Sequence, residues 1–175
     1  MNTLAAIAAV TLSFAQYTEI ADKWTPFTVK KGGFSVLMPG TPIESPIQTL
    51  HTGRGTIYVH VYWCTTPSEV FGVSYAEPAP GVTSESPREM IASARNGFKN
   101  ASGGKLLSER QFKYDGKLAA EFEFPAKGGI CTSQVFCAKN LCCGLMTVRP
   151  RGHGVSEDQR KFIRSFKFIS KTAIR

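Results

Sequence analysis

The sequence predicts an α+β domain in which a mainly antiparallel sheet is covered by helices. Three observations predict it. Short apolar segments of strand length recur along the chain, several of them are joined by loops of two or three residues, and two stretches carry helix-start signals. Short loops make neighbouring strands antiparallel, and the apolar face of such a sheet needs helices to cover it.

The first fifteen residues are expected to be a secretory signal peptide, which leaves residues 16–175 as a single α+β domain. Residues 4–15 are uncharged and rich in alanine, and the small residues Ser13 and Ala15 stand three and one before a cut after Ala15. The three preceding residues contain no Lys or Arg, so a buried first helix of the fold is the alternative. A signal peptide predicts an exported protein, periplasmic or secreted, with no stable membrane span after cleavage.

The first strands are expected early in the domain. A short helix is expected near residues 18–23, followed by an extended segment at 26–29. The strand at 34–38 ends at Pro39, which cannot donate a hydrogen bond to a sheet, and a weaker strand is expected at 47–50.

The clearest strand pattern covers residues 56–63. Apolar residues occupy alternate positions there, so His60 falls on the other, polar face, where we expect it to be exposed to solvent. Residues 70–75 are expected to pair with this strand in antiparallel fashion.

Two helices are expected from their capping residues. Ser86 is a good N-cap, Pro87 suits the first helical position, and Glu89 completes a capping box. The apolar face of this helix is expected to carry Met90, Ile91, Ala94 and Phe98. A second, short helix should begin after Ser156, and a strand at 165–169 should close the domain.

The hairpin formed by residues 106–112 and 117–124 has two candidate registers. A two-residue turn at Asp115-Gly116 is typical of hairpins, but it places polar residues of the first strand on the apolar face of the second. A three-residue loop that includes Tyr114 pairs Phe112 with Leu118 instead. Because a slip of one residue moves every side chain to the other face, we expect the three-residue loop.

A second hairpin is expected over residues 131–148, and it contains four of the five cysteines. If Lys139-Asn140 is a two-residue turn, Cys137 lies opposite Cys142, where a disulfide is sterically feasible. If the loop has three residues, Cys137 faces Leu141 and this bridge is lost. Cys137 and Cys142 are therefore the candidate disulfide, and the alternative is that the cysteines are small apolar core residues.

The sequence offers no catalytic, metal-binding or cofactor-binding residues that we can name. The cysteine spacing lacks the C-x-x-C element typical of zinc sites, and nothing pairs a histidine with a cysteine as a nucleophile requires. The Gly32-Gly33 pair precedes a strand, whereas phosphate-binding glycine loops follow one. The loop 149–154 could bind an anion, but it is equally well explained as a solvated loop.

The chain is basic, with a net charge of +8 and a Lys/Arg-rich end from Arg149 onward. Such a charge suits an anionic envelope component, although a solvated surface explains it too. Phe162, Phe166 and Phe168 stand between basic residues but at core-facing positions, so we do not expect nucleic-acid binding.

Several segments together resemble one group of proteins: residues 32–42 (GGFSVLMPGTP), 73–75 (VSY), 103–109 (GGKLLSE), 121–124 (EFEF) and 161–168 (KFIRSFKF). They resemble uncharacterised exported bacterial proteins similar to the PsbP/Mog1-like fold, an α/β sandwich. The resemblance covers about residues 24–169 and implies a fold and no activity. As far as the resemblance goes, members of that fold class are mostly binding or assembly proteins. Cys142-Cys143 departs from the leucine-tyrosine type of pair expected at that place.

We therefore expect a non-enzymatic exported domain that binds a protein partner or ligand, and that needs no cofactor. Its partner is an unknown protein or an anionic envelope component. The alternative function is a cysteine- or metal-dependent envelope enzyme.

Overall fold

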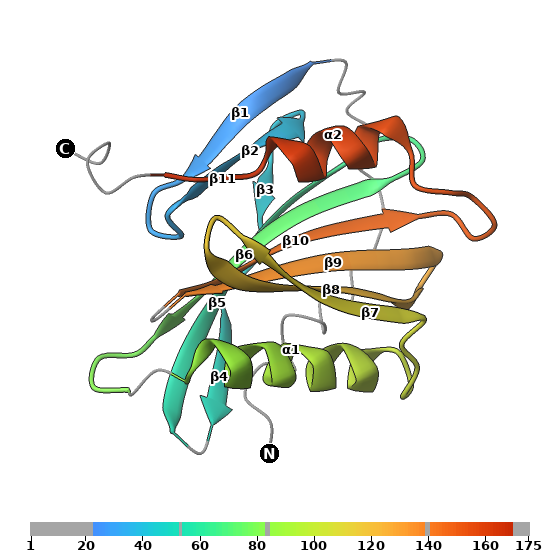
Figure 1. Ribbon diagram of the computed structural model, residues 1–175. Helices are drawn as coiled ribbons and strands as arrows, with labels where there is room; N and C mark the ends of the chain where they lie inside the picture. The colour runs from blue at the N-terminus through green and yellow to red at the C-terminus, as the bar shows by residue number, and fades with distance from the viewer. Residues whose placement is uncertain (1–22, 53, 83–84, 139–140, 170–175) are drawn as a thin grey trace.

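The computed structural model describes residues 23–52, 54–82, 85–138 and 141–169, which form a large sheet with a layer on each face (Figure 1). The predicted signal peptide and most of the helix expected near residues 18–23 lie outside these residues. The elements in chain order are β1 Trp24–Val29, β2 Phe34–Pro39, β3 Ile43–Glu44, β4 Gln48–Thr52, β5 Gly55–Thr65, β6 Val70–Pro78, α1 Pro87–Ala101, β7 Ser108–Tyr114, β8 Lys117–Ala126, β9 Gly129–Ala138, β10 Leu141–Arg149, α2 Glu157–Ser165 and β11 Lys167–Phe168.

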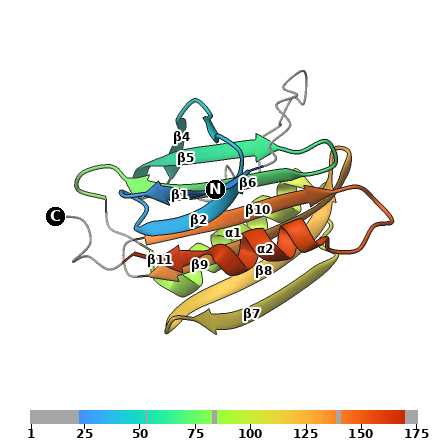
Figure 2. The same ribbon diagram turned by 90° about the horizontal axis from the view of Figure 1, so that it is seen from above.

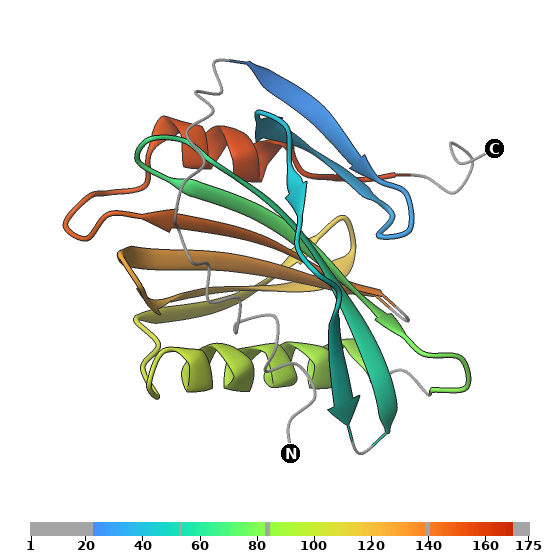
Figure 3. The ribbon, with the colours of Figure 1, turned by 180° about the vertical axis from the view of Figure 1, so that it is seen from behind.

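The large sheet is antiparallel throughout its described pairs, with the strand order β3-β5-β6-β10-β9-β8-β7 and with β4 also paired to β5. Figure 3 shows the edge formed by β4 and β5, whose lower part lies at the level of α1. The strands predicted at 56–63 and 70–75 are confirmed as the antiparallel pair β5 and β6.

Helix α1 covers one face of the large sheet. Ser86 accepts a hydrogen bond from the backbone of Glu89, whose side chain accepts one from Ser86 in return, so the predicted capping box is confirmed. The inward face of the helix packs on β-strand residues from β5, β8, β9 and β10. These core residues of the helix are Met90, Ile91, Ala94 and Phe98.

The opposite face is covered by a second sheet as well as by a helix. Strands β1, β2 and β11 form a separate three-stranded sheet, which shares this layer with α2 (Figures 1 and 2). The prediction of a mainly antiparallel sheet covered by helices is thus confirmed in part, since a second sheet shares in the covering and the fold is richer in strands. Three phenylalanines, Phe34, Phe136 and Phe166, lie between the two sheets. The ring centroids of Phe136 and Phe166 are 4.3 Å apart, and the rings are stacked.

The predicted register of the β7–β8 hairpin is wrong. Tyr114 pairs with Lys117, and Asp115 and Gly116 both have positive φ, as a two-residue turn of this type requires. The apolar pattern misled the prediction because β7 is an edge strand, so polar residues on its α1 side stay in solvent. Glu109, for example, pairs with Arg95 of α1. The observed register packs Phe112, which is partly buried, against the core on the other face.

Candidate functional site

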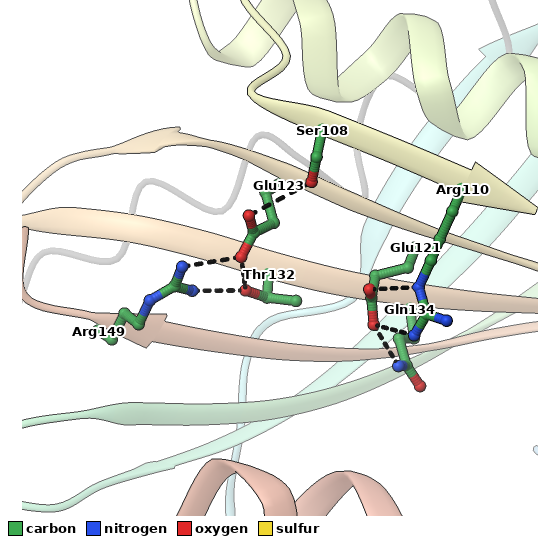
Figure 4. Close-up of polar contacts among 7 residues, drawn as sticks. All are labelled: Ser108, Arg110, Glu121, Glu123, Thr132, Gln134 and Arg149. Atoms are coloured by element: carbon green, nitrogen blue, oxygen red, sulfur yellow. Dashed lines mark hydrogen bonds and ion pairs between the residues drawn. The ribbon is translucent and has the colours of Figure 1, made fainter. Parts of the chain in front are cut away.

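A strip of polar side chains crosses β7, β8, β9 and β10 on the face opposite α1. Ala120 and Phe122 pack against α1, so the intervening Glu121 points to the other face of the sheet. On this face Phe136 contacts Phe168 of β11 and pairs with Ala119 of β8, and Glu121 lies two residues further along β8. We call this set of residues the polar strip: Ser108, Arg110, Glu121, Glu123, Thr132, Gln134 and Arg149 (Figure 4).

The first row of the polar strip joins three neighbouring strands. Arg110, Glu121 and Gln134 stand opposite one another on β7, β8 and β9. Arg110 donates from Nε and Nη2 to the two carboxylate oxygens of Glu121, at 2.7 and 3.2 Å. Gln134 donates its amide to Oε2 of the same carboxylate. The carboxylate is thus held from both sides.

The second row is held by a largely buried arginine, Arg149, whose side chain is 11% exposed. Glu123 accepts hydrogen bonds from Ser108 and Thr132, and Nη2 of Arg149 donates to its Oε1 at 2.8 Å. Arg149 also donates to the Thr132 hydroxyl at 2.8 Å. Four strands therefore meet in one hydrogen-bonded network (Figure 4).

The chemistry of this strip favours a structural or recognition role. Burial opposes ionisation of Glu121, but the hydrogen bonds of Arg110 and Gln134 and the charge of Arg110 outweigh it and lower the pKa of this carboxyl. A general acid needs a raised pKa so that it still holds its proton near neutral pH. Glu121 is instead held ionised.

A second polar cluster surrounds His60, whose predicted exposure is wrong. The side chain is buried, its ring stacks on Tyr75 at 4.4 Å, and its two nitrogens lie 3.7 Å from Glu44 and 3.8 Å from Glu77. The small three-stranded sheet (β1, β2 and β11) covers the face that was predicted to be polar. Phe27 of β1 contacts Tyr62, which lies on the same face of β5 as His60.

Burial of this face also changes the pKa of a tyrosine in the cluster. Burial raises the pKa of Tyr62 to about 12, and a hydrogen bond to Glu44 adds to the effect. The two carboxylates approach His60 on its opposite ring nitrogens, so they do not converge on one point. In the part of the chain that the structure describes, no three His, Cys, Asp or Glu side chains are grouped closely enough to hold a metal ion.

All five cysteines are buried, and they divide between the two faces of the sheet. Cys131, Cys137 and Cys142 lie on the α1 face, whereas Cys64 and Cys143 lie on the other. The register places Cys142 opposite Cys137, with their sulfur atoms 2.7 Å apart, as the two-residue alternative requires. Whether they form a disulfide stays a prediction.

The environment of these thiols disfavours reactivity. Burial raises the pKa of Cys64 to about 12 and also raises the pKa of Cys131 and Cys143. The contact with Cys137, together with burial, raises the pKa of Cys142. Reactive cysteines need a lowered pKa and some exposure.

Basic side chains gather on the outer side of α2 and β11. We call Arg160, Lys161, Arg164 and Lys167 the α2 basic face, and all four are exposed. Lys161 lies over the ring of Trp24 at 4.6 Å, and Arg160 pairs with Glu157. Within the described residues, Arg164 and Lys167 form no ion pair.

The remaining residues considered from the sequence are dispersed. His51 lies exposed on β4, and His153 lies in the exposed loop after β10, where its carbonyl accepts a hydrogen bond from Arg149. Phe162 and Phe166 are fully buried. Their rings therefore belong to the core.

The architecture has a counterpart among solved structures. The chain is similar to cyanobacterial PsbP (CyanoP) from Synechocystis sp. PCC 6803, with a TM-score of 0.51 and 14% sequence identity, over 90% of this chain and 98% of that chain. The fold is PsbP-like. No protein-family model matches the chain, and no curated protein matches it by sequence. The PsbP-like fold agrees with the fold that the sequence motifs imply, and at this identity the likeness concerns the fold alone.

None of the helices in the described ranges is both long enough and apolar enough to cross a bilayer. The polar strip of this PsbP-like fold was not predicted from the sequence. A signal was present, since Glu121 and Glu123 alternate with buried phenylalanines. It could not be interpreted because the partners come from three other strands, and one of those was placed in the wrong register.

Proposed function

We propose that this protein is a non-enzymatic exported domain that binds an acidic protein partner through the α2 basic face. The observation that carries the proposal is the group of four exposed basic side chains on α2 and β11, three of which form no ion pair with the described residues. Unpaired charges at a surface attract an oppositely charged partner and set the rate of association. The net charge of +8 acts in the same direction.

A protein partner suits this face better than a lipid surface does. Helices that lie in a membrane insert apolar side chains. The large apolar side chains of α2 point inward instead, and Phe162 packs on Phe71 of the sheet. The contact between Lys161 and Trp24 also holds one cation in place, which suits a partner of defined shape.

The alternative, a cysteine- or metal-dependent envelope enzyme, gains no support from the geometry. The thiols are buried with raised pKa values, and the paired carboxylates of the polar strip are neutralised by arginines. Among the residues that the structure describes, no three His, Cys, Asp or Glu side chains are grouped to hold a metal ion.

The proposal is tested by capture with the full-length protein from the native envelope fraction at increasing salt. A double variant, Arg164→Gln with Lys167→Gln, should weaken binding of the captured protein about tenfold, which corresponds to about 1.4 kcal/mol. The control, Arg88→Gln with Lys105→Gln, removes the same charge from exposed positions in and after α1 and should bind like the wild type. Binding should also fall as salt screens the charges.

Two outcomes would contradict the proposal. One is equal loss of binding in the two double variants, which would indicate a general effect of net charge. The other is tighter binding to phosphatidylglycerol vesicles than to any acidic protein, which would indicate a lipid surface.

A further inference from the structure

We propose that Cys137 and Cys142 form a structural disulfide that joins β9 to β10 next to their turn. The inference does not depend on the α2 basic face, because both cysteines lie on the α1 face of the sheet. It rests on the register of the hairpin, on the positions of the other cysteines and on burial.

The register brings the two side chains together. Ala138 pairs with Leu141, so the next pair from the turn is Cys137 with Cys142. In a two-residue hairpin this second pair is a non-hydrogen-bonded one, in which the Cα atoms are only about 4.5 Å apart and the side chains are closest. The two sulfur atoms lie 2.7 Å apart, and a bond of about 2.05 Å needs only a small further approach.

The alternation of side chains excludes competing pairs. Cys143 is the immediate neighbour of Cys142 but points to the other face, as its place in the second core shows. Cys131 shares a face with Cys137 but stands opposite Val148, six positions along β9, which is about 20 Å at about 3.3 Å per residue.

The two cysteines on the other face cannot pair with each other either. Cys64 pairs with Phe71 of β6, which in turn pairs with Thr147 of β10. Thr147 lies four residues from Cys143, so the two cysteines are offset by about 13 Å along the strands. Three thiols therefore remain, and one disulfide forms.

The chemistry needs a disulfide oxidant, such as oxidised glutathione. The thiolate of one cysteine attacks a sulfur of the oxidant, forms a mixed disulfide and releases one thiolate. The second cysteine attacks the protein sulfur of that mixed disulfide and releases the second thiolate. Overall, two protein thiols lose two electrons and two protons, and the oxidant is reduced to two thiols.

Burial under α1 assigns the bond a structural role. Cys137 is 1% exposed and Cys142 is 3% exposed, so a reductant does not reach the bond in the folded protein. The reaction occurs while the hairpin is accessible, before α1 packs on it. An exposed redox-active pair would show the opposite arrangement.

The test refolds the full-length protein in a buffer of oxidised and reduced glutathione, then denatures and alkylates it and measures its mass. Of five cysteines, three should be alkylated before reduction and five after it. Trypsin cuts after Lys139, so the bond should link peptide 128–139 to the peptide that begins at Asn140. Fragmentation of this linked species should show Cys131 and Cys143 alkylated.

Single variants provide the controls. Cys143→Ser should keep the bond and show two alkylated thiols, whereas Cys142→Ser should show four. Five alkylated thiols in the wild type at the most oxidising ratio would overturn the proposal. A linked peptide that persists in Cys142→Ser through Cys143 would overturn it as well.

Discussion

Arg110 of β7 stands directly opposite Glu121 of β8, and its guanidinium donates two hydrogen bonds to the carboxylate. The register predicted from the apolar pattern would have placed Glu109 there, with two like charges facing each other. The observed pair exists only because the turn has two residues. It therefore offers a direct test of the register.

We expect a coupling energy of about 0.5–1 kcal/mol between Arg110 and Glu121. The magnitude is modest because the arginine side chain is 64% exposed and the glutamate side chain 20%. Urea unfolding of Arg110→Gln, Glu121→Gln and the double variant measures it. The same cycle with Lys113→Gln should give a value near zero, since Lys113 pairs with Leu118. Equal coupling in both cycles would contradict the register.

The stabilisation by this pair should depend on pH. The pKa of Glu121 is lowered in the folded state, so its contribution is complete above the unfolded value of about 4.3 and is lost as pH falls through the folded value. The stability difference between wild type and Glu121→Gln should therefore shrink below about pH 4.

Tyr114→Phe should lower stability by about 1 kcal/mol. The Tyr114 hydroxyl donates to the carbonyl of Phe166, where the chain passes from α2 to β11, so its loss weakens the contact between the β7–β8 turn and the small sheet. Tyr58→Phe is the matched control, because Tyr58 is exposed on β5. Thermal unfolding of the two variants gives the comparison, and equal melting temperatures would count against this role.

Gly129→Ala should destabilise the protein by about 1–3 kcal/mol. A Cβ atom at Gly129 would collide with the backbone carbonyl of Arg149, so β9 and β10 would have to separate. Gly154→Ala is the control, since a Cβ there meets open space and should change stability by less than about 0.5 kcal/mol. Denaturant midpoints that fall equally in both variants would indicate a different cause.

Glu69→Gln should stabilise the protein more at pH 7 than at pH 3.5. Burial raises the pKa of Glu69, and its hydrogen bond from Ser156 and the charge of Arg149 offset this only in part. A carboxyl with a raised folded pKa destabilises the fold increasingly as pH rises from the unfolded value of about 4.3 through the folded one. The glutamine keeps an oxygen for Ser156 and carries no charge.

The control for this pH effect is Glu157→Gln, a change at an exposed position in the first turn of α2. Denaturant unfolding at the two pH values should show a pH-dependent gain for Glu69→Gln alone. A gain that is the same at both pH values would contradict the assigned cause.

The sequence determined the features of this protein that depend on neighbours along the chain. The cap of α1 needs only Ser86 and Glu89, three residues apart, and the alternation of β5 is visible in its own residues. Tight turns belong to this class only in part. The Asp115-Gly116 signal was present but the apolar pattern outweighed it, and for the second hairpin the two-residue turn that brings Cys137 and Cys142 together was one of two alternatives.

Tertiary structure decided what depends on which face is covered and by what. The apolar rule failed for β7 because an edge strand keeps polar residues in solvent, and it failed for His60 because the small sheet covers a face expected to be open. Predicting the polar strip requires the registers of four strands at once. Burial and pairing across strands are set by segments far apart in sequence, and one residue of slip exchanges the two faces.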